Sequence, residues 1–349
     1  TFNFNLKELT KFGKFNSCIV IGMGGSILGS EAIYQFLHHK IKKDFYFIND
    51  LDENYILKLE KKLNFKNTLF LIISKSGNTI ETLSNLLRLN ILKKKQNNII
   101  VISEKKNNLL YTFTKKFNLF YVEHKNYIGG RYSVLSEVGV IPAYFMGLDI
   151  LKLRKNLEKY LLKNKLLKES SIQFAKLLMS KKYNTLVFLN YSPRLEKFLF
   201  WCQQLLAESL GKKRMGFLPI VSSVPKDHHS LLQLYLDGPK NKLFHFLSIE
   251  EKNKKKLKVK KFGKQIKFLN NKNLNQIKIA QKNALIKVFK KNQIPYKETV
   301  IKNLNEETLG ELFSYFMIET IIVGKLININ PFSQPSVEQV KIFTKKLLS

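Results

Sequence analysis

The stretch Thr68-Leu-Phe-Leu-Ile-Ile-Ser-Lys-Ser-Gly-Asn-Thr-Ile-Glu-Thr82 decides the fold of this chain. Its continuous apolar run, Leu69–Ile73, is typical of a strand buried on both faces of a parallel sheet. The residues that follow recur with the spacing of a helix, at Ile80, Leu83, Leu86 and Leu87. The stretch therefore predicts a strand, a tight turn and a helix in succession.

The turn between this strand and this helix is rich in hydroxyl groups. Free backbone N–H groups and the helix dipole favour an anion at the start of a helix. Gly77 lets the backbone approach a ligand closely. Capping the helix would need only one hydroxyl, whereas the turn offers a lysine and four hydroxyls: Lys75, Ser74, Ser76, Thr79 and Thr82. We therefore expect an anion-binding site here rather than a capped helix alone.

Strand and helix patterns alternate along the rest of the chain. Further strands are expected at Ser17–Gly22, Phe45–Ile48, Ile99–Ile102 and Leu119–Val122, and a second set at Thr185–Leu189, Lys242–Leu247 and Lys297–Ile301. Helices are expected at Ile27–Leu37, Leu274–Lys290, Glu306–Leu326 and Val337–Leu348. This alternation predicts an α/β protein with two doubly wound domains, each a mainly parallel sheet flanked by helices.

Composition narrows the possible partners. The 349 residues carry a formal charge of +34, which invites a nucleic-acid hypothesis. However, the lysines are spread along the chain, and the densest run, Lys252–Lys261, is more typical of a solvated loop. No apolar run approaches the roughly 20 residues that span a bilayer. Cys18 and Cys202 lie in apolar contexts, which favours buried thiols in a reducing cytoplasm over a disulfide.

A second glycine-rich loop follows the first predicted strand, Gly22-Met-Gly-Gly-Ser-Ile-Leu-Gly-Ser30. It suggests a dinucleotide site, with Asp50 placed to hold a ribose. The spacing does not fit, because a G-x-G-x-x-G count from Gly22 places Ile27 at the third glycine. We therefore expect no nucleotide cofactor, and a backbone loop from which Ser26 reaches the same anion as the first turn.

Several other polar residues are candidates for catalysis or substrate binding. Gln204 and Glu208 are four residues apart and share a helix face, and a partly desolvated glutamate there is suited to act as a base. Arg131 follows a glycine pair. The adjacent His228 and His229 face different ways, and no spacing in the chain suggests metal ligands. Each residue also has a simpler local explanation as a surface or structural group, as do Gln334 and Lys341 near the C-terminus.

Taken together and in order, these blocks resemble the glucose-6-phosphate isomerase family of the sugar isomerase (SIS) superfamily. The Ser-x-Ser-Gly-x-Thr core is shared across the superfamily, whereas the Glu208, His229 and C-terminal blocks are specific to the isomerase. The resemblance implies two SIS-type domains (17–165 and 166–330) and a C-terminal active-site segment (331–349). The short N-terminal extension (1–16) departs from the family, in which bacterial members have a longer helical region before the first strand. It also implies a cytoplasmic homodimer with active sites at the subunit interface, acting in glycolysis and gluconeogenesis.

The resemblance further implies reversible conversion of glucose 6-phosphate to fructose 6-phosphate through a cis-enediolate, without metal or cofactor. The phosphate would be held by Ser26, Ser74, Lys75, Ser76 and Thr79, with Thr82 close behind. Glu208 would be the base, Arg131 would stabilise the enediolate, and His229 of the neighbouring subunit would assist ring opening with Lys341. Gln204 and Gln334 would line the site. Because His228 stands where relatives usually have Gln, which histidine acts stays open.

The sequence leaves three alternative functions open. A dual isomerase of the same fold would also accept mannose 6-phosphate. A sugar-phosphate sensor would need only the Ser74–Thr82 turn and would have no use for the remaining site residues. A nucleic-acid binder would show steeply salt-dependent affinity, although the sequence contains no recognised nucleic-acid module.

Overall fold

The computed structural model describes residues 4–93, 96–155, 157, 165–251, 255–259 and 263–349. The part of the dense lysine run at 252–254 and 260–261 therefore lies outside the described residues. The chain begins with a short helix, α1 (Leu6–Leu9), and a 3-10 turn, Thr10–Phe12. Leu9 and Phe12 are buried in the main hydrophobic core, so this segment packs with the body of the protein.

The first sheet has five parallel strands: β1 (Ser17–Ile21), β2 (Asp44–Ile48), β3 (Thr68–Ile73), β4 (Ile99–Ser103) and β5 (Phe120–Glu123). They lie in the order β2-β1-β3-β4-β5. The strand order reverses direction between β1 and β3, which makes a topological switch point. Every residue of β3 is buried, as the apolar run predicts.

The second sheet has four parallel strands: β6 (Thr185–Asn190), β7 (Leu218–Ser223), β8 (Lys242–Ile249) and β9 (Tyr296–Ile301). Their order is β7-β6-β8-β9. β7, which contains Pro219, was not predicted from the sequence. A proline cannot donate to a central ladder but is tolerated at an edge, and β7 is an edge strand.

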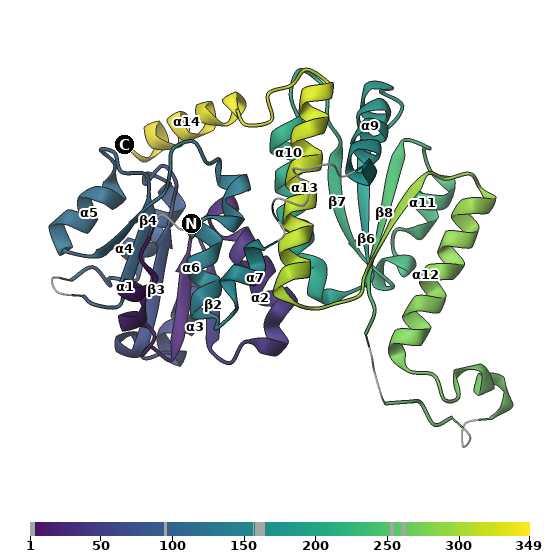
Figure 1. Ribbon diagram of the computed structural model, residues 1–349, viewed down its shortest axis with the longest axis horizontal. Helices are drawn as coiled ribbons and strands as arrows, with labels where there is room; N and C mark the ends of the chain where they lie inside the picture. The colour runs from purple at the N-terminus through teal and green to yellow at the C-terminus, as the bar shows by residue number, and fades with distance from the viewer. Residues whose placement is uncertain (1–3, 94–95, 156, 158–164, 252–254, 260–262) are drawn as a thin grey trace.

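Helices cover both faces of both sheets, which confirms the predicted α/β class (Figure 1). The outer face of the first sheet packs on α3 (Glu53–Lys62), α4 (Ile80–Arg88) and α5 (Leu109–Phe117). The outer face of the second packs on α11 (Leu232–Asp237) and α12 (Leu274–Lys291). These two outer layers enclose the sheets and the helices between them.

The layer between the sheets is built from α2 (Leu28–Leu37), α6 (Glu137–Phe145), α7 (Ile150–Arg154), α9 (Lys165–Met179), α10 (Glu196–Leu210) and α13 (Glu306–Leu326). Their apolar side chains form one continuous core that touches the inner faces of both sheets, from Val20 and Leu71 in the first to Phe188 and Leu247 in the second. The two halves of the chain are therefore joined through shared packing rather than through a linker alone.

The last helix, α14 (Glu338–Leu348), is packed differently from the others. Figure 1 shows it leading away from the end of α13 toward the side of the molecule that holds the first sheet. None of its residues is buried, and Val340, Phe343 and Leu347 are exposed on its surface. Among the described helices, not one has the length and apolar character required to cross a membrane.

Candidate active site

Two loops meet at the switch point of the first sheet. β1 and β3 are parallel neighbours, so the loops after them emerge at the same edge. They are in close contact, since a Cβ atom on Gly22 would lie 2.9 Å from the carbonyl oxygen of Ile73, the residue that precedes the Ser74 turn. The two glycine- and hydroxyl-rich loops predicted to share an anion therefore lie side by side.

The Ser74 turn leaves the start of α4 available to a ligand. The side chain of Thr79, the N-cap residue, makes no capping hydrogen bond. Its hydroxyl lies 2.8 Å from the Ser74 hydroxyl, which in turn accepts from the backbone N–H of Gly77. Gly77 has φ +69°, and a side chain there would collide with Asn108. The turn is thus fixed by its own hydroxyls, while the helix N-terminus remains without a side-chain cap.

The other predicted phosphate residues differ in exposure. Ser76 is exposed at the tip of the turn, and Ser26 is half-buried on the neighbouring loop. Thr82 is buried inside the first turn of α4, where its hydroxyl has no hydrogen-bond partner in the described part of the chain. The ammonium of Lys75 donates to the carbonyl of Asn126 at 2.9 Å and lies 3.7 Å from Glu104.

The Gly22–Ser26 loop connects this turn to a second polar cluster. Gly24 has φ +52°, and a Cβ atom there would lie 2.6 Å from Nε2 of Gln204. A Cβ atom on Gly25 would lie 2.3 Å from the backbone of Gly130. Both positions require glycine because the backbone is in direct contact with its neighbours. The contacts place the anion turn next to the residues around Gln204 and Arg131.

Glu208 lies in this cluster, on the last turn of α10. Its Oε1 accepts a hydrogen bond from Nε2 of Gln204 at 2.9 Å, which confirms that the two residues share a helix face. Its Oε2 faces Nη1 of Arg131 at 3.3 Å. The side chain is 32% exposed, so the carboxylate is held on both oxygens yet still reachable from solvent.

Arg131 is the most constrained side chain of the cluster, with 3% of its surface exposed. Its Nε donates to the Ser209 hydroxyl at 2.8 Å, and its Nη1 donates to Gln334 Oε1 at 2.8 Å as well as to Glu208. Its Nη2 donates to the carbonyls of Pro331 and Ser333. All five N–H groups of the guanidinium therefore have partners. Arg131 ties the glycine-pair loop, the end of α10 and the C-terminal segment together.

His229 lies elsewhere in the chain. It ends a 3-10 turn, Lys226–His229, that follows β7, and its side chain is exposed. The turn stays at the carboxyl edge of the second sheet, because Ser222 donates to Asp227 at 2.9 Å. At that edge Ser223 contacts Glu196, the first residue of α10. Glu208 comes twelve residues later, about 18 Å along the helix. Within one chain, His229 and Glu208 are therefore at opposite ends of α10.

His228, the alternative histidine, faces inward. Its Nε2 lies 3.0 Å from the hydroxyl of Tyr191. Burial lowers the pKa of His228, and the neighbouring His229 lowers it further. Of the two adjacent residues, His229 is exposed and His228 is half-buried.

Lys341 is also exposed. It lies in the first turn of α14, with Nζ 2.7 Å from Glu338 of the same helix. Its segment is nonetheless anchored in the cluster, because Gln334 and the carbonyls before it are held by Arg131. Lys341 is thus seven residues beyond the anchored Gln334, on a helix without buried residues.

Three residues of the cluster were not singled out from the sequence. Ser209 receives Arg131, and its hydroxyl lies 2.8 Å from that of Tyr132. Burial raises the pKa of Tyr132. Lys212 donates to the carbonyl of Asn330, and burial, with Arg131 nearby, lowers the pKa of its ammonium. In the sequence, these residues are marked only by their neighbours, since Ser209 follows Glu208 and Tyr132 follows Arg131.

This arrangement can hold an anion at one end and move a proton at the other. The switch-point loops supply backbone N–H groups and hydroxyls, and Glu208 is a reachable carboxylate beside a buried guanidinium. Within the described residues, no group of three or more His, Cys, Asp or Glu side chains could hold a metal ion. The fold and the site define an α/β protein of two parallel sheets, with a site suited to a small anionic substrate beside a carboxylate and a guanidinium.

Comparison with known proteins gives the family. Residues 8–349 match the family model of phosphoglucose isomerase, and the chain belongs to this family. A protein of Methanococcus maripaludis named a probable glucose-6-phosphate isomerase is 33% identical, over 98% of this chain and 81% of its own length. A glucose-6-phosphate isomerase of Methanocaldococcus jannaschii is 30% identical, over 99% and 87% of the two chains.

A solved structure agrees with the fold. The crystal structure of a glucose-6-phosphate isomerase from Chlamydia trachomatis superimposes with a TM-score of 0.80, at 19% identity. The alignment covers 98% of this chain and 71% of that one. At this identity the likeness supports the arrangement of the elements alone.

Proposed function

We propose that this enzyme interconverts glucose 6-phosphate and fructose 6-phosphate through a cis-enediolate, as a step of glycolysis and gluconeogenesis. The observation that carries the proposal is the position of Glu208. Its carboxylate is held by Gln204 and Arg131, and the contacts of Gly24 and Gly25 join this cluster to the anion turn. The relatives named above support the substrate pair.

Proton transfer is assigned to Glu208. The C–H proton next to a sugar carbonyl is weakly acidic, so the reaction needs a fixed base and positive charge near the enediolate oxygens. Glu208 takes the proton from C2 or C1 and returns it to the other carbon. Arg131 supplies the positive charge, and its buried, fully bonded guanidinium keeps that charge in one place. Gln204 and Gln334 orient the carboxylate and the guanidinium.

The phosphate is assigned to the switch-point turn. The uncapped start of α4, with Ser76 and Thr79 in reach of solvent, suits a dianion. Ser26 approaches from the neighbouring loop, Ser74 and Thr82 shape the turn from inside, and Lys75 adds positive charge. Binding the phosphate at a distance from C1 and C2 positions the reacting carbons against Glu208.

Ring opening is assigned to His229 of a second copy of the chain, together with Lys341. The separation of about 18 Å along α10 prevents His229 from reaching Glu208 of its own chain. A homodimer with active sites at its interface would bring the exposed His229 of one copy to Glu208 of the other. The exposed apolar side chains of α14, which carries Lys341, are available to such an interface. The cytoplasm, where hexose phosphates are metabolised, is the proposed location.

A coupled assay of the purified chain on fructose 6-phosphate tests the proposal. We expect turnover with and without a chelator, and loss of turnover in Glu208→Gln with the fold retained. Absence of turnover in the parent chain would leave a sugar-phosphate sensor as the better account, and loss with the chelator would contradict the metal-free mechanism. The same assay with mannose 6-phosphate decides whether the enzyme has dual specificity.

A further inference from the structure

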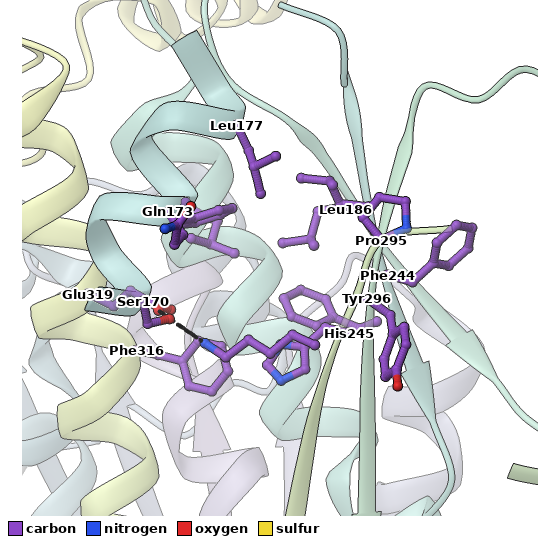
Figure 2. Close-up of a pocket in the computed structure, with 15 residues that line it drawn as sticks. Ser170, Gln173, Leu177, Leu186, Phe244, His245, Pro295, Tyr296, Phe316 and Glu319 are labelled. Carbon is purple, nitrogen blue, oxygen red and sulfur yellow. Dashed lines mark hydrogen bonds and ion pairs between the residues drawn. The ribbon is translucent and has the colours of Figure 1, made fainter. Parts of the chain in front are cut away.

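A cavity of about 210 Å³ lies between α9, α13 and the inner face of the second sheet. Its wall is mostly hydrocarbon, with leucines from α9, β6, α10 and β8: Leu177, Leu186, Leu206 and Leu243. Figure 2 shows Leu177 and Leu186 on one side of the space and Ser170, Glu319 and His245 on the other. A cavity of about 150 Å³ is known to accept benzene, so this one has room for a single ring.

The polar end of the cavity carries no net charge. The ammonium of Lys297 donates to the Ser170 hydroxyl at 2.9 Å, the Tyr315 hydroxyl at 2.7 Å and Glu319 Oε1 at 3.1 Å. Burial opposes the charge on Lys297, but Glu319 and Tyr315 outweigh it and raise the pKa of the ammonium. All three ammonium donors are used and the carboxylate balances the charge. A phosphate or carboxylate ligand would find no free cation at this end.

His245 lines the same wall. The residue is 4% exposed, and its Nε2 lies 2.8 Å from the hydroxyl of Thr299. Nδ1 makes no hydrogen bond within the described part of the chain. Burial, with Lys297 nearby, holds the pKa of His245 well below its ordinary value, so the ring is neutral. Depending on the tautomer, Nδ1 of a neutral imidazole either donates or accepts.

We propose that this cavity is a binding site for a neutral, one-ring aromatic molecule that bears a hydroxyl group. The ring packs between the leucines and Phe316, which itself stacks with His245 at 6.0 Å between ring centroids. The hydroxyl bonds Nδ1 of His245, and it does so with either tautomer because a hydroxyl both donates and accepts. Neither Glu208 nor Arg131 lines the cavity, so the site is distinct from the candidate active site.

Phenol and benzene are the probes, titrated against the unmodified chain by calorimetry and by NMR. We expect saturable binding of phenol at one site, about fivefold tighter than benzene, because the two probes differ by one hydrogen bond. Equal affinities would overturn the assignment of His245, and failure of either probe to saturate would overturn the site.

Two tryptophan variants of α9 locate the binding. Leu177→Trp places an indole into the cavity, whereas Leu166→Trp adds the same group at a position that is 77% exposed and does not line it. We expect Leu177→Trp to weaken phenol binding at least about tenfold and Leu166→Trp to leave it unchanged. His245→Phe should bind both probes equally. Phenol binding that survives Leu177→Trp in a folded protein would contradict the proposal.

Discussion

Replacing Arg131 with lysine tests how the site is held together. Lysine keeps the positive charge but offers one compact ammonium in place of a planar fork. The five contacts of Arg131 diverge toward Ser209, Glu208, Gln334 and the carbonyls of the C-terminal segment, so one ammonium can satisfy only some of them. If two contacts are lost, at about 1.5 kcal/mol each for a charged donor, Arg131→Lys should lower the free energy of unfolding by about 3 kcal/mol.

The effect of this substitution on turnover should exceed its effect on stability. A displaced charge no longer faces the oxygens of the enediolate, and the loss of such preorganised electrostatic stabilisation costs about 100-fold or more in rate. Denaturant unfolding gives the stability change, and the coupled assay gives kcat and KM.

Arg88→Lys is the matched control for Arg131→Lys. Arg88 also makes several contacts to carboxylates, Glu53 and Glu60, but the three side chains are between 32% and 59% exposed. Exposed ion pairs contribute little, so this variant should keep most of its stability and its rate. Our account of Arg131 is refuted if Arg131→Lys and Arg88→Lys lose equal stability, or if Arg131→Lys turns over within twofold of the parent.

Thr79→Val removes the hydroxyl that bonds Ser74, so steady-state kinetics should show kcat/KM for fructose 6-phosphate falling about tenfold. An unchanged kcat/KM would show that Thr79 is not part of the phosphate site. Mixing inactive Glu208→Gln and His229→Ala chains should restore up to about a quarter of the parent activity, because half of the dimers are mixed and each mixed dimer has one intact site. If subunit exchange is verified and no activity returns, the shared site is contradicted. His245 stays neutral when the protein is folded, whereas the unfolded chain takes up a proton below the ordinary pKa of 6.5. The free energy of unfolding should therefore fall by up to about 1.4 kcal/mol per pH unit below that pH. Unfolding measured as a function of pH should show a flatter slope for His245→Phe.

Much of the fold follows from local sequence. Apolar runs such as Leu69–Ile73 are typical of strands buried on both faces, and the structure has β3 over Thr68–Ile73. The long helices at 274–291 and 306–326 also match their periodic patterns. β7 was missed because Pro219 interrupts its pattern, and its place at the edge of a sheet is a property of the assembled fold.

The site depends on contacts that sequence cannot show. The four-residue spacing places Gln204 against Glu208, and the hydrogen bond between them follows from helix geometry. The approach of Arg131 to Glu208, and of both to Gln334, depends on how distant segments pack, and no local pattern carries that information. Likewise, Lys341 and His229 are exposed in the single chain, so their proposed roles rest on contacts with substrate or with a second copy.

The most direct test of the central claim is the rate of proton exchange at C2 of glucose 6-phosphate in deuterated water, measured by NMR for the parent chain and Glu208→Gln. If Glu208 is the base, the parent should introduce deuterium at C2 of glucose 6-phosphate and at C1 of the fructose 6-phosphate that it forms. The variant should lose both activities by several orders of magnitude while remaining folded. A Glu208→Gln protein that still exchanges the C2 proton at a rate near that of the parent would contradict the account.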